Sequence, residues 1–220
     1  MCGRFVANIP ADVLKGIFAL IETPQLAPRY NVAPTQQVAV VRNLGEISRL
    51  DLLKWGLVPS WSKDPSFGSH LINARSETVD EKPTFRHAIK YRRCIVPTSG
   101  FYEWDHRGGK KQPYYIQLAD YSPMCLAGVW ESWKAPDGSE LETFAILTTS
   151  ANKLVESIHD RMPVILSPDT FNLWLNHNMH DPQQLQPLYQ PFPAEKMHAF
   201  KVADLVNNSR FDSPDCIVQV

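Results

Sequence analysis

Short runs of β-branched and aromatic residues recur along the chain and predict a fold dominated by strands. In one such run, Tyr114, Ile116 and Leu118 alternate with Tyr115 and Gln117. This alternation places successive side chains on opposite faces of a sheet. The predicted strands cover residues 4–6, 38–42, 47–55, 94–97, 114–118, 124–133, 141–148, 164–166 and 197–202.

Helical periodicity is confined to fewer segments. Within residues 11–21, Val13, Leu14, Ile17 and Phe18 recur at the spacing of one helix face, which predicts an amphipathic helix. Residues 83–93 are predicted to form a second helix, whose positive charges we interpret as a solvated face. The remaining predicted helical segments are 152–158, one that opens at Ser167 and Pro168, and 182–189.

Turn signals join neighbouring strands. Residues 43–46 contain an Asn and a Gly, residues 106–111 form a basic turn that contains Gly, and residues 136–138 read Pro-Asp-Gly. Tight turns connect antiparallel strands, and the strands outnumber the helices. We therefore predict an α+β fold: a single domain over residues 1–220 with a mainly antiparallel, curled and partly barrel-like sheet and peripheral helices.

Composition restricts the class of protein further. The 220 residues are 44% hydrophobic, and 22 Lys and Arg residues nearly balance 23 Asp and Glu residues, so nucleic-acid binding would require local clustering of positive charge. Cys2, Cys94, Cys125 and Cys216 are far apart, which argues against a zinc site or a disulfide framework. No apolar run has the length of a membrane span or a signal peptide. We expect a reduced, cytoplasmic protein without metal, cofactor or membrane partner.

The second residue carries the most distinctive chemistry. Aminopeptidases that remove the initiator Met1 accept a small second side chain, so the mature chain is expected to begin at Cys2. It would present an α-amine with a pKa of about 7.7–8.0 and a thiol with a pKa of about 8.5, both partly nucleophilic at neutral pH. With an aldehyde, the amine can form an imine and the thiol can then close a thiazolidine ring. Many chains begin Met-Cys without consequence, so these residues alone do not establish a function.

Two further residues have the chemistry of proton transfer. Glu103 lies among aromatic residues; on an inward strand face its pKa would be raised by burial, whereas on an outward face it would be an ordinary surface residue. Alternation does not choose between these faces. His159 stands beside Asp160 and Arg161 at the end of a predicted helix, where it is a candidate proton shuttle, although a lone histidine is more often structural.

A polar, proline-broken loop over residues 59–70 contains Trp61, which no periodic element would bury. Such a tryptophan commonly plugs the edge of a core, but it could also stack on a nucleobase. A second loop contains Pro24, Pro28 and Pro34, which stiffen its backbone.

Seven short motifs, in order along nearly the whole chain, together resemble the SRAP (SOS-response-associated peptidase) family, bacterial YedK type. Each motif alone is weak, whereas the ordered set is specific. They are Met1-Cys2-Gly3-Arg4-Phe5, Asn31-Val32-Ala33-Pro34, Trp55-Gly56-Leu57, Ile72-Asn73-Ala74-Arg75-Ser76-Glu77-Thr78, Gly100-Phe101-Tyr102-Glu103-Trp104, Lys111-Gln112-Pro113-Tyr114 and His159-Asp160-Arg161-Met162-Pro163.

The resemblance implies a monomeric sensor of abasic sites in single-stranded DNA that becomes covalently joined to the lesion through Cys2. It implies that Asn73 orients the terminal amine or the sugar, that Glu103 moves protons during imine formation, and that His159 assists sugar-ring opening and reversal. It also implies self-cleavage when residues precede the cysteine, and a nucleoid-associated location when bound. The implied DNA contacts are Arg4, Arg75, Arg161, Trp61 and Pro34.

The chemistry explains why a thiol would accompany the amine. An imine on the opened sugar acidifies the neighbouring carbon and invites β-elimination, which breaks the strand. Addition of the thiol removes the imine and leaves that carbon saturated, so the strand stays intact.

Two other functions compete with this one. The first is a cysteine or N-terminal-nucleophile peptidase that uses Cys2 with His159 and Glu103. The second is a non-covalent DNA-binding module in which Cys2 is incidental. A peptidase would turn over peptides, a binding module would be unaffected by Cys2→Ser, and a sensor would form one stable adduct per protein.

Overall fold

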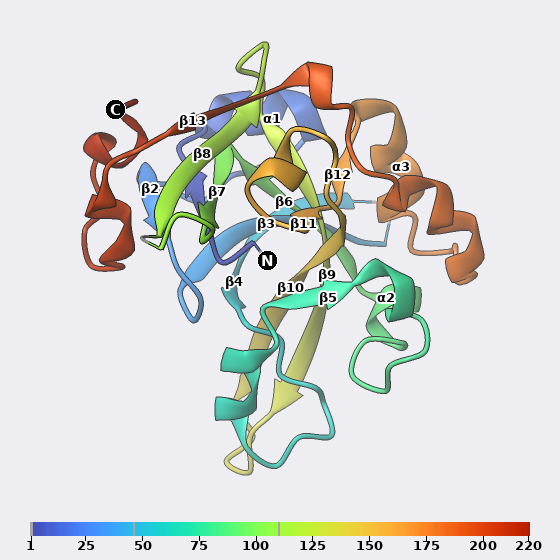
Figure 1. The fold of residues 1–220 in the computed structure, drawn as a ribbon. Helices are drawn as coiled ribbons and strands as arrows, with labels where there is room; N and C mark the ends of the chain where they lie inside the picture. The colour runs from blue at the N-terminus through green and yellow to red at the C-terminus, as the bar shows by residue number, and fades with distance from the viewer. Residues whose placement is uncertain (1, 46, 110) are drawn as a thin grey trace.

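The strands of the protein form two sheets, which Figure 1 shows from one side. The computed structural model describes residues 2–45, 47–109 and 111–220. Within these residues, one sheet consists of β1 (Arg4–Ala7), β2 (Arg29–Val32), β7 (Gly100–Asp105), β8 (Gln112–Leu118) and β13 (Met197–Lys201). Its order is β13–β8–β7–β1–β2, and the described pairings are antiparallel.

The other sheet curls until it closes. Its described strands are β3 (Gln37–Leu44), β4 (Ile47–Trp55), β5 (Asn73–Arg75), β6 (Arg93–Thr98), β9 (Met124–Lys134), β10 (Glu140–Ser150), β11 (Arg161–Pro163) and β12 (Ile165–Leu166). Their order is β11–β10–β4–β3–β6–β9–β12, with β5 beside β10. Because β9 also pairs with β10, the strands β10, β4, β3, β6 and β9 form a small barrel. The predicted α+β fold with a partly barrel-like sheet is confirmed.

Apolar side chains hold these layers together. One buried cluster joins the five-stranded sheet to one face of the barrel strands and contains Phe5, Trp55, Phe101 and Phe144. A second cluster packs helices against alternate residues of the same barrel strands. Within the described residues the α-helices are α1 (Ala11–Phe18), α2 (Ala88–Tyr91) and α3 (Phe171–Leu175), and both α2 and α3 lie at the right of Figure 1, with α3 above α2.

Most other helical turns are short 3-10 segments. They are Pro65–His70, Ser76–Thr78, Val155–Ser157, Pro168–Thr170, Pro182–Tyr189, Ala194–Lys196, Asp204–Asn207 and Pro214–Ile217. The helix predicted over residues 152–158 is reduced to one of these turns, and the Asn152 side chain accepts the N–H groups of Leu154 and Val155 just before it. In the described part of the chain, no helix has both the length and the apolar character needed to traverse a bilayer.

The helix predicted over residues 11–21 begins as expected but ends at Phe18. Ala19 adopts a left-handed conformation with φ 50°, and the N–H groups of Ala19 and Leu20 both bond to the Lys15 carbonyl. This arrangement satisfies a carbonyl of the last turn and directs the chain away from the helix axis.

The second predicted helix, over residues 83–93, is also shorter, and the interpretation of its charge is wrong at Arg93. Arg93 begins β6 and is buried, with its guanidinium directed at carbonyl groups where α2 and α3 end. A cation placed there satisfies carbonyls that have no partner within their helices. The carbonyls that accept from it belong to Ile89, Lys90, Trp174, Asn176 and Met179.

Two predicted turns contain residues 46 and 110, which lie outside the described residues. The strands on either side of each turn are paired as predicted: β3 with β4, and β7 with β8.

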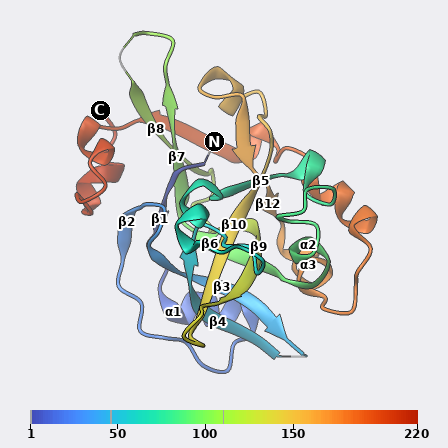
Figure 2. The same ribbon diagram turned by 90° about the horizontal axis from the view of Figure 1, so that it is seen from below.

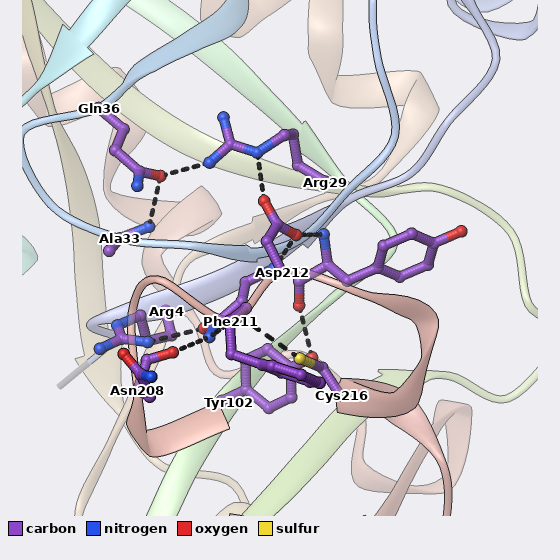
Figure 3. A network of polar contacts seen from close by, with 11 residues as sticks. Arg4, Arg29, Ala33, Gln36, Tyr102, Asn208, Phe211, Asp212 and Cys216 are labelled. Carbon is purple, nitrogen blue, oxygen red and sulfur yellow. Dashed lines mark hydrogen bonds and ion pairs between the residues drawn. The ribbon is translucent and has the colours of Figure 1, made fainter. Parts of the chain in front are cut away.

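The C-terminal segment is tied to the edge of the five-stranded sheet (Figure 3). Asn31 is fully buried on β2, and its Nδ2 donates to the carbonyl oxygens of Val206, Asn208 and Phe211. Arg4 donates to Asn31 Oδ1 at 2.7 Å and to the Val206 carbonyl at 2.9 Å. The Asn31 motif therefore has a structural role, because it fastens the end of the chain beside the strand that follows Cys2.

We expect Asn31→Ala to lower the free energy of unfolding by about 3 kcal/mol, because it leaves several buried carbonyls and the Arg4 guanidinium without their partner. Urea denaturation measures this loss. Asn43→Ala is the control, since its side chain accepts a single hydrogen bond from Ser48 in a hairpin. That substitution should cost less than about 1 kcal/mol. Equal losses in the two variants would contradict the assignment.

Candidate functional site: a buried cysteine between two sheets

The fold brings together the four residues assigned to chemistry. Cys2 precedes β1, Asn73 begins β5, Glu103 lies on β7, and His159 stands two residues before β11. Figures 1 and 2 both show the segment that leads into β1 between β7 and β5. Asn73 Nδ2 donates to the Cys2 carbonyl at 2.9 Å, which joins the start of the chain to the barrel sheet.

Cys2 is fully buried in the apolar cluster between the sheets. Burial raises the pKa of its thiol far above the usual value, and the negative charge of Glu103 raises it further. The thiol therefore stays protonated at neutral pH in this environment, and its sulfur lies 4.0 Å from the Arg4 carbonyl. Met1, whose removal the sequence predicts, lies outside the described residues.

Glu103 occupies the inward face of β7. It is 2% exposed, and it alternates with Tyr102, which packs in a separate cluster beneath the C-terminal segment. Burial raises the pKa of the Glu103 carboxyl, and the positive charge of His159 partly opposes this increase. A carboxyl whose pKa is shifted toward neutrality can both hold and release a proton under physiological conditions.

His159 has a partner for each protonation state. Its Nδ1 lies 3.0 Å from the backbone N–H of Arg161 and 2.8 Å from Asp160 Oδ1. In the neutral ring Nδ1 accepts from Arg161, which places the proton on Nε2; in the cationic ring Nδ1 can donate to Asp160. Because the ring is half-buried and Asp160 is largely exposed, the imidazole stands at the boundary between the cluster and solvent.

Asn73 offers an acceptor as well as a donor. Its Oδ1 is buried and accepts no hydrogen bond from any described residue. Buried polar atoms in native proteins are rarely left in this state. The atom is therefore suited to accept an N–H or O–H group from a ligand at this site.

The residues predicted to contact DNA fall into two groups. The Arg75 side chain is exposed and follows Asn73 by two residues, and Trp61 is 61% exposed, so it does not plug the core. Arg4 and Arg161 are already bonded to other parts of the protein. Pro34 is half-buried in the loop between β2 and β3.

The loop that carries Trp61 is exposed but firmly placed. Gly56 has φ 124°, and a Cβ on it would lie 2.6 Å from the carbonyl oxygen of Gly68. Only glycine permits this approach of the loop to the end of β4. In addition, the Trp133 indole N–H donates to the Ser62 carbonyl at 2.7 Å. The Trp-Gly-Leu motif thus positions the loop.

Sequence reasoning assigned no role to Glu77, which is placed close to this site. Its carboxylate pairs with Arg161, and Arg161 also donates to the Thr148 carbonyl. Glu77 stands within the motif of residues 72–78, but nothing in a single sequence distinguishes a paired glutamate from one on an ordinary surface.

Fold and site together define a class of proteins in which a cysteine near the N-terminus is buried beside an amide, a carboxyl and an imidazole. Residues 1–209 match the family described as SOS response associated peptidase (SRAP). The chain belongs to this family.

Named relatives and solved structures resemble the chain over nearly its full length. Abasic site processing protein YoqW of Bacillus subtilis (strain 168) is 42% identical over 221 residues and covers 99% of both chains. Abasic site processing protein HMCES of Xenopus tropicalis is 31% identical and matches all of this chain and 78% of its own. A crystal structure of a Bacteroides thetaiotaomicron protein covers 100% of both chains with a TM-score of 0.90 and 29% identity.

We expect Glu103→Gln to remove a pH-dependent loss of stability. The pKa of Glu103 is raised in the folded protein. Its contribution to the free energy of unfolding is therefore complete below 4.5, the ordinary pKa of a glutamate, and is lost as pH rises through the pKa of the folded protein. The amide of the variant cannot ionise. The free energy of unfolding of the variant should therefore increase relative to that of wild type as pH rises from about 4 to about 8. Denaturant unfolding across this range measures the difference. The exposed Glu156→Gln is the control, and a difference independent of pH would contradict the burial of an ionisable Glu103.

Proposed function

We propose that this protein senses abasic sites in single-stranded DNA and becomes covalently joined to them through Cys2. The observation that carries this proposal is the buried constellation in which Asn73 holds the Cys2 backbone beside Glu103 and His159. The names of the relatives support the substrate, since they are described as abasic site processing proteins. DNA processing of this kind would take place in the cytoplasm, at the nucleoid.

The proposed reaction begins once Met1 has been removed and Cys2 carries a free α-amine. The amine adds to the aldehyde carbon of the opened sugar, and loss of water gives an imine. The thiol sulfur then adds to the imine carbon, and the nitrogen gains a proton. The product is a thiazolidine in which the carbon is bonded to both sulfur and nitrogen, with one water molecule released overall.

Proton transfer is the step for which the site is suited. The thiol is neutral because burial raises its pKa, so its proton must leave as the carbon–sulfur bond forms. Glu103 and His159 influence each other electrostatically and are the two titratable groups proposed to accept and return protons. Groups of this kind typically contribute about 10²–10⁴-fold to a rate.

Asn73 would orient the reacting groups. Its Nδ2 is bonded to the Cys2 carbonyl, which leaves the buried Oδ1 for the α-amine or a sugar hydroxyl. A fixed amide of this kind restricts the nucleophile to one approach, and such positioning supplies a substantial part of catalysis in many enzymes.

DNA binding would rely on local rather than global charge. The exposed Arg75 and Trp61 are proposed to contact a phosphate and a base, respectively. Phosphate contacts from Arg4 and Arg161, and a contact from Pro34, are part of the same proposal, although both guanidinium groups have protein partners in this structure.

The environment of the Cys2 thiol is less suited to a general peptidase. Cysteine nucleophiles of peptidases are activated by a lowered thiol pKa, whereas burial raises the pKa of Cys2. Self-cleavage of residues that precede Cys2 is a single event on the protein's own chain, and it remains compatible with the proposal.

Cys2→Ala should abolish a heat-stable adduct with an oligonucleotide that contains an abasic site, and should leave reversible DNA binding in place. Denaturing electrophoresis and intact mass measure the adduct. Cys125→Ala, which removes a buried thiol from another part of the fold, should form the adduct normally. A tetrahydrofuran lesion, which cannot open to an aldehyde, should give none with wild type. An adduct that persists in Cys2→Ala would refute the assignment.

Arg75→Ala should weaken reversible binding of single-stranded DNA and reduce the slope of log affinity against log salt by about 0.7, the value for one lost phosphate contact. Fluorescence anisotropy across a salt series measures the slope. Arg49→Ala removes an arginine that is 57% exposed on β4 and should leave the slope unchanged. Equal slopes for wild type and Arg75→Ala would remove Arg75 from the DNA contacts.

A further inference from the structure

An ion pair connects the two segments that carry Asn73 and His159. The carboxylate oxygens of Glu77 accept from Nη1 and Nη2 of Arg161 at 2.5 and 2.9 Å. Glu77 follows Asn73 by four residues, and Arg161 follows His159 by two. Bidentate pairs of this type fix the plane of the guanidinium as well as its position.

A third segment completes the connection. Arg161 Nη2 also donates to the Thr148 carbonyl at 2.7 Å, and Thr148 lies on β10. In the strand register Thr148 is opposite Arg75 of β5. Ser150, two residues further along β10, is opposite Arg161 of β11. The guanidinium therefore joins β5, β10 and β11 at the level of the site.

The backbone of Arg161 extends this connection to the imidazole. Its N–H donates to His159 Nδ1 at 3.0 Å, and this bond selects the neutral ring form that carries its proton on Nε2. If Arg161 moved, the imidazole ring of His159 would lose this bond. Its orientation would then change, and the preference for a proton on Nε2 would be lost.

We propose that Glu77 is a positioning residue that acts on the reaction through His159. Glu77 holds the Arg161 guanidinium, and Arg161 in turn holds the imidazole in its orientation. This inference rests on the proposed function, because it concerns the rate at which the Cys2 adduct forms and reverses.

Glu77 could either position Arg161 or simply occupy the place of a DNA phosphate beside Arg161. The geometry favours the positioning role. The Arg161 side chain is 12% exposed, and its Nε is buried. A phosphate that replaced Glu77 would have to break two hydrogen bonds to reach a guanidinium that Thr148 still holds, so the phosphate contact proposed for Arg161 would be made without displacing Glu77. Glu77 itself is 49% exposed, so it can be substituted without opening the core.

The test is a double-mutant cycle measured in single turnovers at saturating abasic DNA. Glu77→Gln should slow adduct formation on the order of 10-fold, because a displaced catalytic group loses much of its contribution. In a His159→Ala background the same substitution should cause no further change, since the group that it positions is gone. Glu142→Gln is the matched control: Glu142 forms a bidentate pair with Arg42 near the other end of β10, and its loss should leave the rate unchanged.

A second measurement does not depend on activity. In the free protein, ring-nitrogen resonances of His159 should shift in Glu77→Gln and stay in place in Glu142→Gln. Unchanged resonances, or a Glu77→Gln effect of full size in the His159→Ala background, would overturn the inference. Tighter DNA binding with an unaltered rate would also overturn it and would assign Glu77 to competition with phosphate. Absence of any wild-type adduct would instead reject the proposed function, with the resonances still reporting on the positioning.

Discussion

The arrangement of the site depends on the length of β10. One edge of this strand pairs first with β4 and then with β5, and its other edge pairs first with β9 and then with β11. Because the first edge accommodates two partners in succession, the chain can leave the sheet after β4 and return to it at β5. The excursion from β4 to β5 carries Trp61 and ends at Asn73, while β11 is preceded directly by the segment that carries His159. One strand thus aligns two segments that are far apart in sequence.

The five-stranded sheet supplies the other half of the site and its low polarity. Cys2 and Glu103 both lie where this sheet packs on the barrel strands, and burial is the main reason that the pKa of each group is raised. The Cys2 thiol and the Glu103 carboxyl both resist ionisation here, which would be unusual on the protein surface. Such groups suit the proposed reaction, in which protons move as bonds form. The hydrogen bonds of Arg4 to Asn31 and to the Val206 carbonyl hold the strand that follows Cys2. The C-terminal segment therefore also supports the site.

The chain belongs to the SRAP family, and the relatives described as abasic site processing proteins agree with a role in processing such lesions. The similarity extends over the whole chain in both sequence and fold. The arrangement also separates two uses of arginine. Arg75 is exposed beside the site, whereas Arg93 is buried to satisfy helix carbonyls, and composition alone treats the two alike.

The sequence by itself determined most strands, the start of α1 and the mainly antiparallel sheet, and it supplied Cys2, Asn73, Glu103 and His159 as the candidate residues of the site. These features follow from local periodicity, turn chemistry and short motifs, all of which are readable along the chain. Tertiary structure alone decided that Glu103 faces inward, that the second predicted helix ends before Arg93, and that Glu77 reaches Arg161. Each of these depends on contacts between distant segments, and alternation or charge in one segment carries no information about which partner will cover it.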